Sequence, residues 1–358
     1  MTQALVIGGG IAGLSAAAHL SRDAEVTVLE GEEALGYHAS GRSAALIEQN
    51  YGAPSVQALN RASVEYLQTH DGGYLTPRGL MILGTAEEEE AFRTDLADMG
   101  LEEISVDCAC GMVPVLNPDR LRFAGYHADA QDIDTDRLMQ GFARTLRQNG
   151  GDILTRQKVR SLRYHNEKWE LQTDAQAHRA DIVINAAGAW ADQIAGLAGV
   201  APMRITPHRR SMARIPAPDG QDVSNWPMFF GVGESWYAKP DAGCLLVSPA
   251  DEDPVEPHDA WAEEMTLATG IALFEKMVTT QVTRLLSSWA GLRSFAPDRT
   301  LVLGPDPAAP GFIWCAGQGG YGFQTAPAAG QLVADLVFGR DSALPAQVVA
   351  ALKPERLR

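Results

Sequence analysis

Cysteine is scarce in this sequence, with only four residues of this type among 358. They are Cys108, Cys110, Cys244 and Cys315, too few and too scattered for a disulfide framework. Cys108 and Cys110 form a Cys-x-Cys pair, but no second pair or histidine cluster follows at ligand spacing. We therefore expect free thiols in a reducing cytoplasm and no metal site.

Long apolar runs are also missing. No segment approaches the ~18 uninterrupted apolar residues of a membrane-spanning helix. The N-terminus has no charged segment followed by an apolar stretch of the signal-peptide type, because Met1–Gln3 passes directly into the apolar residues Ala4–Ile7. These absences predict a cytoplasmic protein without an integral membrane segment.

Positive charge is the third deficit. The 29 lysines and arginines stand against 45 aspartates and glutamates, which gives a net charge of −16. Such a surface repels phosphate backbones and anionic lipids, so we expect no nucleic-acid partner, and a tRNA-modifying activity is disfavoured. Hydrophobic residues make up 46%, as in folded globular proteins. The length exceeds the ~100–200 residues of one domain, so we expect two.

Glycine, by contrast, is abundant. The 35 glycines are about one residue in ten, above the usual ~7%. Three of them form Gly8-x-Gly10-x-x-Gly13, between an apolar strand at Ala4–Ile7 and a helix expected over Ile11–Ser21. In this context the first glycine permits a tight turn, the second lets a pyrophosphate approach the backbone, and the third allows close helix–strand packing.

An acidic residue stands where a dinucleotide-binding unit needs one. Glu30 ends the next expected strand, Glu25–Glu30, and its carboxylate can accept hydrogen bonds from ribose hydroxyls. Strand, glycine turn, helix and acid in this order predict dinucleotide binding. NAD and FAD both satisfy this first half of the pattern.

The remaining hydrophobic pattern predicts a mixed architecture. Parallel strands alternate with helices near both ends of the chain, and residues 203–250 alternate apolar and polar residues as antiparallel strands do. Further helices are expected at Ser55–Gln68, Ala86–Met99, Asp136–Asn149, Ala191–Ala198, Ala260–Lys276 and Thr325–Phe338. The glycine- and serine-rich connection 36–52 is long enough to suggest a functional loop.

Four further segments carry a family resemblance. They are Gly41–Ala45, Asn185–Trp190, Trp289–Arg293 and Gly317–Gly322. Together they resemble the FAD-dependent D-amino-acid oxidase superfamily, and most closely its bacterial D-arginine dehydrogenase-like members. The likeness runs through nearly the whole chain and extends to Gly36–His38, Asn50–Gly52 and Asp132–Asp136.

The resemblance implies the fold and the cofactor. The fold would be α/β, with a Rossmann-like FAD-binding domain formed by 1–50, 150–200 and 290–358. A discontinuous α+β substrate domain, 51–149 and 201–289, would carry a mixed or antiparallel sheet. FAD would bind non-covalently, because Cys315 matches no attachment motif. The implied FAD contacts are Gly8, Gly10, Ile11, Ala12, Gly13, Glu30, Gly41, Arg42, Ser43, Ala44, Val159, Ala187, Gly188, Trp190, Gly317, Gly319, Gly320, Tyr321, Gly322, Gln324 and Thr325.

The resemblance also implies a substrate site for an amino acid. Arg210 and Arg293 would grip its carboxylate, since a planar guanidinium binds a carboxylate with two hydrogen bonds. Tyr237 would add a hydroxyl, the carbonyl of Gly320 would accept from the amine, and Tyr51 would close the pocket. From the residues alone, Arg209 and Arg210 are also consistent with surface charge on an edge strand, and the tyrosines with core or turn aromatics.

The sequence departs from its relatives at the expected side-chain pocket. Leu80 stands where D-arginine dehydrogenase has a glutamate that pairs with the basic side chain, and Leu46 and Glu48 replace a histidine and a threonine. Leu46, Leu80 and Met228 would suit an apolar side chain, whereas Glu48 could restore a carboxylate if it faces the pocket. The resemblance therefore implies preference for a side chain that is not of the arginine type.

The predicted activity is oxidative deamination of a D-amino acid. Hydride would pass from Cα to flavin N5, and the imino acid would hydrolyse to an oxo acid and ammonia. The alternatives are oxidation of a secondary or N-methyl amine, as in sarcosine oxidase-like enzymes, and a flavin-binding subunit without turnover. The partners expected are a small amino-acid substrate and an electron acceptor that the sequence does not identify.

Overall fold

The computed structural model describes the backbone of all 358 residues and every side chain except that of Asp219. Its first sheet has six strands in the order β19-β20-β13-β1-β2-β9. Neighbouring strands are parallel, except that β19 runs antiparallel to β20. The bounds are β1 Thr2–Ile7, β2 Ala24–Leu29, β9 Asp152–Leu154, β13 Ile182–Asn185, β19 Val302–Pro305 and β20 Phe312–Ala316.

Both faces of this sheet are covered, which explains why its central strands β1, β13 and β20 contain continuous apolar runs. Inward residues such as Val6 and Ile184 pack against helices on one face, while Leu5 and Trp314 pack on the other. The helices of the first face are α1 Ile11–Leu20, α2 Pro54–Thr69, α5 Thr135–Gln148, α8 Gly322–Phe338 and α9 Ala346–Leu352. The second face carries α6 Ala191–Leu197 and the antiparallel strands β10 Val159–His165, β11 Lys168–Thr173 and β12 Ala177–Ala180.

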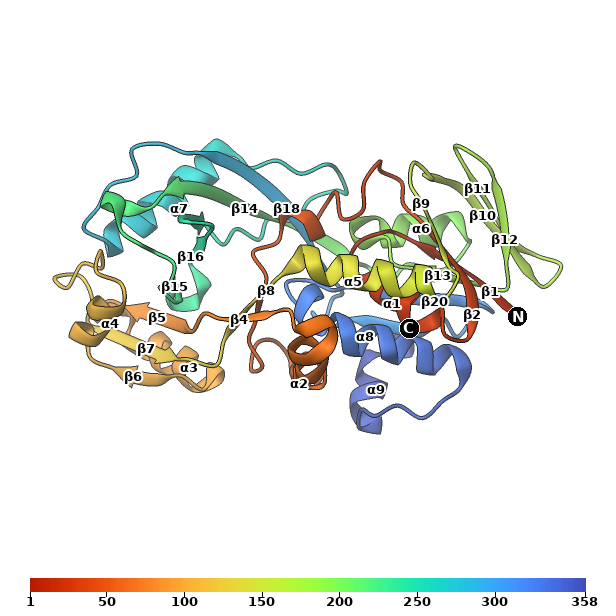
Figure 1. The fold of residues 1–358 in the computed structure, drawn as a ribbon, viewed down its shortest axis with the longest axis horizontal. Helices are drawn as coiled ribbons and strands as arrows, with labels where there is room; N and C mark the ends of the chain where they lie inside the picture. The colour runs from red at the N-terminus through yellow and green to blue at the C-terminus, as the bar shows by residue number, and fades with distance from the viewer.

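A larger sheet forms the other half of the molecule (Figure 1). It has eight strands in the order β18-β14-β17-β16-β15-β5-β7-β6, antiparallel except for the β15–β5 pair. The strands are β5 Leu80–Gly84, β6 Glu102–Ile104, β7 Phe123–His127, β14 Thr206–Pro216, β15 Met228–Gly231, β16 Tyr237–Asp241, β17 Cys244–Ser248 and β18 Ser287–Phe295. Around it lie α3 Glu89–Met99, α4 Val106–Met112 and α7 Glu264–Met277.

A small sheet, β3 Leu46–Ile47, β8 Gln131–Ile133 and β4 Leu75–Pro77, lies between the two halves (Figure 1). Three short 3-10 turns are η1 Ser40–Arg42, η4 Gly188–Trp190 and η6 Val232–Glu234. No helix in the described residues is both long and apolar enough to cross a membrane. The described side chains contain no group of three or more histidine, cysteine, aspartate or glutamate residues placed to hold a metal ion.

The predicted fold class is confirmed, whereas the domain boundaries stay a prediction. One element differs clearly from expectation. The helix expected over Ala260–Lys276 begins only at Glu264, because the preceding residues form an irregular segment held by side chains of other elements. Arg42 donates to the carbonyl of Ala260, and Arg209 pairs with Glu263. The helices α4 and α9 lacked a clear sequence signal and were not expected.

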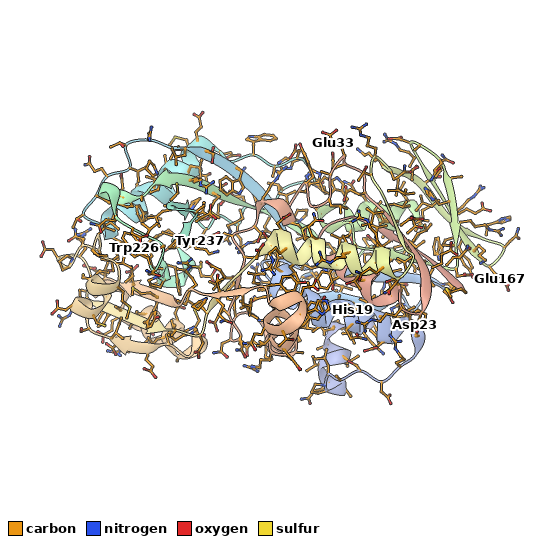
Figure 2. The ribbon with its side chains drawn as sticks, viewed as in Figure 1. His19, Asp23, Glu33, Glu167, Trp226 and Tyr237 are labelled. Atoms are coloured by element: carbon orange, nitrogen blue, oxygen red, sulfur yellow. The ribbon has the colours of Figure 1, made fainter. Side chains whose placement is uncertain are left out.

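A buried histidine in α1 gives the fold a specific sensitivity to acid. His19 (Figure 2) is only 5% exposed and lies between Tyr66 and Phe142, with ring centroids 6.3 and 6.2 Å away. Neither ring nitrogen has a hydrogen-bond partner among the described residues. Burial, with the charge of Arg22 second, therefore lowers the pKa of His19 from 6.5 to about 4.

We predict that lowering the pH from 6.5 to about 4 reduces the free energy of unfolding. In this window the unfolded chain binds a proton at His19 and the native chain does not, a difference worth up to roughly 3 kcal/mol. Urea unfolding across this range should show a shallower pH dependence for His19→Leu than for the wild type. The control is His165→Gln, which changes an exposed histidine. Equal slopes for wild type and His19→Leu would contradict the prediction.

Candidate active site

The turn after β1 can be built only with glycine at two positions. Gly8 has a φ of +110°, and a Cβ there would lie 2.4 Å from the carbonyl oxygen of Ala186. A Cβ on Gly13 would lie 2.0 Å from the carbonyl oxygen of Gly8, so helix α1 packs directly on the turn. Gly10 is less crowded, since its Cβ would first meet Ser40 Oγ at 3.1 Å. The turn therefore leaves the N-terminus of α1 open to a ligand.

Side chains already organise this end of α1. Glu30 accepts hydrogen bonds from Gly9 N–H (2.7 Å) and Glu32 N–H (2.9 Å) and is thereby fixed beside the glycine turn. Ser40 Oγ accepts from Ile11 N–H at 3.0 Å, at the first turn of the helix. Sequence reasoning missed Ser40, although it stands one residue before the Gly41–Ala45 segment.

One elongated cavity runs from the N-terminus of α1 to the larger sheet. Many of the residues predicted to contact FAD line it: Gly10, Ile11, Ala12, Arg42, Ser43, Ala44, Gly188, Gly319, Gly320, Gly322 and Gln324. All the residues predicted for the substrate line it as well: Tyr51, Arg210, Tyr237, Arg293, Gly320, Leu46, Glu48, Leu80 and Met228. The tertiary structure thus brings the two predicted sites into one continuous space.

Other residues predicted to contact FAD lie outside the lining. They are Gly8, Gly13, Glu30, Gly41, Val159, Ala187, Trp190, Gly317, Tyr321 and Thr325. The ring of Tyr321 packs against Tyr51 at a centroid distance of 5.4 Å, and Thr325 Oγ1 donates to the Tyr321 carbonyl (2.8 Å). Trp190 packs on the ring of His38 at 4.6 Å.

Two arginines on neighbouring strands face the cavity. Arg210 on β14 is 8% exposed, and its Nη2 donates to Glu252 at 3.1 Å. Its Nε and Nη1 have no hydrogen-bond partner among the described residues. Burial and the charge of Arg293 lower the pKa of Arg210, yet a guanidinium stays charged in proteins. A buried cation with free donors calls for an anionic ligand.

Arg293 on β18 completes the pair. A Cβ on Gly320 would lie 3.1 Å from Arg293 Nη1, so the glycine loop approaches the guanidinium closely. Burial opposes the charge of Arg293, but Tyr51, Tyr237 and Glu234 raise the pKa of the group. The two guanidinium groups therefore form a positive region in a protein whose overall charge is negative.

Two tyrosines and one unexpected acid surround this positive region. Tyr237 begins β16, in the larger sheet, and is buried (Figure 2). Tyr51 Oη donates to Glu234 Oε2 at 3.1 Å, and burial followed by the charge of Glu234 raises the pKa of Tyr51. Glu234 lines the cavity and has a φ of +51°, a strained backbone position for this residue. Its position three residues before Tyr237 was the available signal, and sequence reasoning did not use it.

Two other arginines hold a surface segment instead. Arg209 pairs with Asp251 (3.3 Å), Asp253 (2.8 Å) and Glu263. This arginine is therefore neither free surface charge nor a group with spare donors. The guanidinium of Arg42 donates to the carbonyls of Ala260 (2.7 Å) and Ala290 (2.9 Å), although the residue also lines the cavity.

The opposite end of the cavity is mainly apolar. Met228 on β15 pairs with Leu80 on β5, and Leu80 pairs with His127 on β7. The lining also includes Met99, Met212 and Phe230 from the same part of the fold. Glu48 belongs to the same lining, and its carboxylate Oε2 lies 2.7 Å from Nε2 of His127.

Comparison with known proteins agrees with this geometry. The family described as FAD dependent oxidoreductase matches residues 3–336. FAD-dependent oxidoreductase domain-containing protein 1 of Bos taurus is 25% identical, covering 93% of this chain and 80% of its own. Glycine oxidase of Pseudomonas putida is 24% identical, covering 95% of both chains. L-proline dehydrogenase from P. horikoshii has the same fold, with a TM-score of 0.85, 24% identity and coverage of 99% and 97%.

The residues present fit an FAD. The glycine turn leaves room at the N-terminus of α1, where the helix dipole and backbone N–H groups favour a pyrophosphate. Gly319 has a φ of +48°, and a Cβ there would lie 2.2 Å from the ring of Phe295, so the loop before α8 presents bare backbone to the cavity. The particular likeness to D-arginine dehydrogenase-like enzymes stays a prediction.

We predict that Gly13→Ala lowers FAD content and thermal stability. The new Cβ would overlap the Gly8 carbonyl and push α1 away from the turn that receives the pyrophosphate. The ratio of flavin to protein absorbance after purification, together with the melting temperature, measures the effect. Gly196→Ala in α6 is the matched control, because its Cβ would meet nothing within 4 Å. Equal FAD content in the two variants would contradict the prediction.

Proposed function

Because the chain belongs to the FAD dependent oxidoreductase family, we propose that it oxidatively deaminates a D-amino acid. The substrate loses hydride from Cα and a proton from the amine, and water hydrolyses the resulting imino acid to an oxo acid and ammonia. FAD supplies the two-electron acceptor for this hydride. The chain's own residues bind the substrate and orient Cα.

The pair of buried guanidinium groups is the observation that carries this proposal. Arg210 retains free donors and Arg293 lies beside it in the cavity, so an α-carboxylate would satisfy both. The hydroxyls of Tyr51 and Tyr237 stand in the same lining and can donate to that carboxylate. Holding the carboxylate at several points orients the rest of the substrate, and orientation alone accounts for a large part of a rate enhancement.

The acid beside these donors favours a zwitterionic ligand. Glu234 lies within hydrogen-bond distance of Tyr51 and faces the same cavity. A substrate with a carboxylate and an amine would meet positive and negative groups in one place. The carbonyl of Gly320 would accept a hydrogen bond from its amine. The D configuration rests on the likeness of nearly the whole chain to bacterial D-arginine dehydrogenase-like enzymes.

The side chain would point to the apolar end of the cavity. Leu46, Leu80 and Met228 line that end, so arginine-type side chains are disfavoured. The second candidate is oxidation of a secondary amine, which the name of the L-proline dehydrogenase with the same fold favours. A cytoplasmic location and non-covalent FAD stay predictions, and the electron acceptor is not identified.

An anaerobic substrate screen that follows loss of flavin absorbance tests the proposal. We expect D-leucine and D-methionine to reduce the flavin faster than D-arginine, their L enantiomers or sarcosine. Faster reduction by sarcosine or proline would establish the second candidate instead. No reduction by any amine would support a flavin-binding subunit without turnover.

We predict that Arg293→Lys raises KM for the substrate and lowers kcat/KM by about 100-fold, because a lysine cannot make the paired hydrogen bonds of a guanidinium. Steady-state kinetics with the best substrate of the screen measure this change. Arg163→Lys is the matched control, since the side chain of Arg163 is 76% exposed. An unchanged KM in Arg293→Lys would argue against the carboxylate-binding role.

A further inference from the structure

The buried side chain of Arg210 is bound by one carboxylate from outside the cavity. Glu252 Oε1 accepts a hydrogen bond from Arg210 Nη2 at 3.1 Å. Glu252 lies in the segment between β17 and α7, and Arg299, its other partner, lies in the turn between β18 and β19. Neither residue is part of the cavity lining. Glu252 therefore contacts Arg210 from outside the space that a ligand would fill.

The backbone around Glu252 is fixed to strand β14. Its carbonyl accepts a hydrogen bond from His208 Nδ1 at 2.9 Å. The preceding residue, Asp251, accepts from the N–H and the hydroxyl of Ser211 at 2.6 and 2.8 Å. His208 and Ser211 stand on either side of Arg210 in the same strand. The carboxylate of Glu252 is therefore kept within reach of that guanidinium.

Arg299 binds the same carboxylate at shorter distances. Its Nη2 lies 2.8 Å from Glu252 Oε1 and 3.0 Å from Oε2. The guanidinium is also placed over the ring of Phe295, with Cζ 3.8 Å from the centroid. Burial would raise the pKa of Glu252, but Arg299 and the two cavity arginines lower it overall. The carboxylate is therefore ionised at neutral pH.

One carboxylate is thus shared between an exposed and a buried cation. The side chain of Arg299 is 46% exposed and that of Arg210 is 8% exposed. Arg299 contacts both oxygens of Glu252, whereas Arg210 contacts only one. Glu234, the acid on the cavity side, accepts from Tyr51 and forms no ion pair with Arg210 among the described side chains. A single negative charge cannot balance two positive ones, so part of the charge of Arg210 stays available to a ligand.

We infer that Arg299 is a positioning residue for substrate binding, although it lies outside the cavity. By binding both oxygens of Glu252, it keeps this carboxylate from neutralising Arg210, which can then bind the carboxylate of the substrate. Without Arg299, the internal carboxylate would compete with the substrate for the same guanidinium. This inference rests on the proposed function and adds a residue that controls substrate affinity through another.

Removal of the Arg299 charge tests the inference on the FAD-loaded enzyme. We expect Arg299→Gln to raise KM for the best substrate of the screen, and Kd for butanoate, by about tenfold, as is common within one ion-pair network. Isothermal titration calorimetry measures butanoate binding, which needs no turnover. The value of kcat should change by less than about twofold, because Arg299 touches no reacting atom. Arg299→Lys keeps the positive charge and should stay within about threefold of the wild type.

A second substitution separates this role from packing. Arg299→Gln also removes the contact with Phe295, and that loss persists when Glu252→Gln is added. The competing charge, however, is then gone, so the double variant should recover the butanoate affinity of the wild type to within about threefold. Glu252→Gln alone should not weaken binding, since its amide oxygen can still accept from Arg210. Arg160→Gln, which changes an exposed and ion-paired arginine on β10, is the matched control and should leave both constants unchanged.

The outcomes separate this inference from the proposed function. Unchanged KM and Kd in Arg299→Gln, or weaker binding in Glu252→Gln alone, would overturn the role of Arg299 but not the proposed deamination. A double variant that binds as weakly as Arg299→Gln would do the same. Butanoate binding that follows the expected pattern, without flavin reduction by any amine, would support the role of Arg299 and contradict deamination. Absence of both binding and reduction would overturn both.

Discussion

The placement of two guanidinium groups in the cavity, with only one ion-paired carboxylate for the two, is the constraint on which the site depends. Arg210 and Arg293 are on adjacent strands of the larger sheet, and both face the cavity. Arg210 has one carboxylate partner, Glu252, which Arg299 also binds. Such an arrangement is unfavourable in an empty site and becomes favourable when a carboxylate enters. The free energy of folding that these charges cost is therefore recovered when a carboxylate substrate binds.

Several acidic residues around the site pair with Arg209 and not with Arg210 or Arg293. Arg209 forms ion pairs with Asp251, Asp253 and Glu263. Arg42 donates a hydrogen bond to the carbonyl of Ala260 in the same irregular segment. These contacts fix the irregular segment before α7 to strand β14 and to the turn η1. The net charge of −16 consequently says little about the cavity, whose lining contains both arginines and glutamates.

Backbone conformation determines which residues can form the cofactor part of the cavity, whereas charge determines which ligand the substrate part can bind. Gly8 and Gly13 are needed for contact between turn, strand and helix, and Gly319 is needed for the loop before α8, where a Cβ would meet the ring of Phe295. The sequence predicted these loops because their requirements are local: each depends on a few consecutive residues. It also predicted that parallel strands alternate with helices near both ends of the chain, since buried strands and amphipathic helices have distinct periodicities.

The amino-acid sequence by itself determined the glycine turn, the dinucleotide-binding unit, the fold class and most residues of the cavity. Only the tertiary structure decided what neighbouring residues do. Arg209 and Arg210 are consecutive on one strand, so their side chains point to opposite faces, and the sheet order decides which face meets the cavity. Ser40 and Glu234 were missed for the same reason. Each acts on a partner far away in the chain, and no local pattern of residues records such a contact.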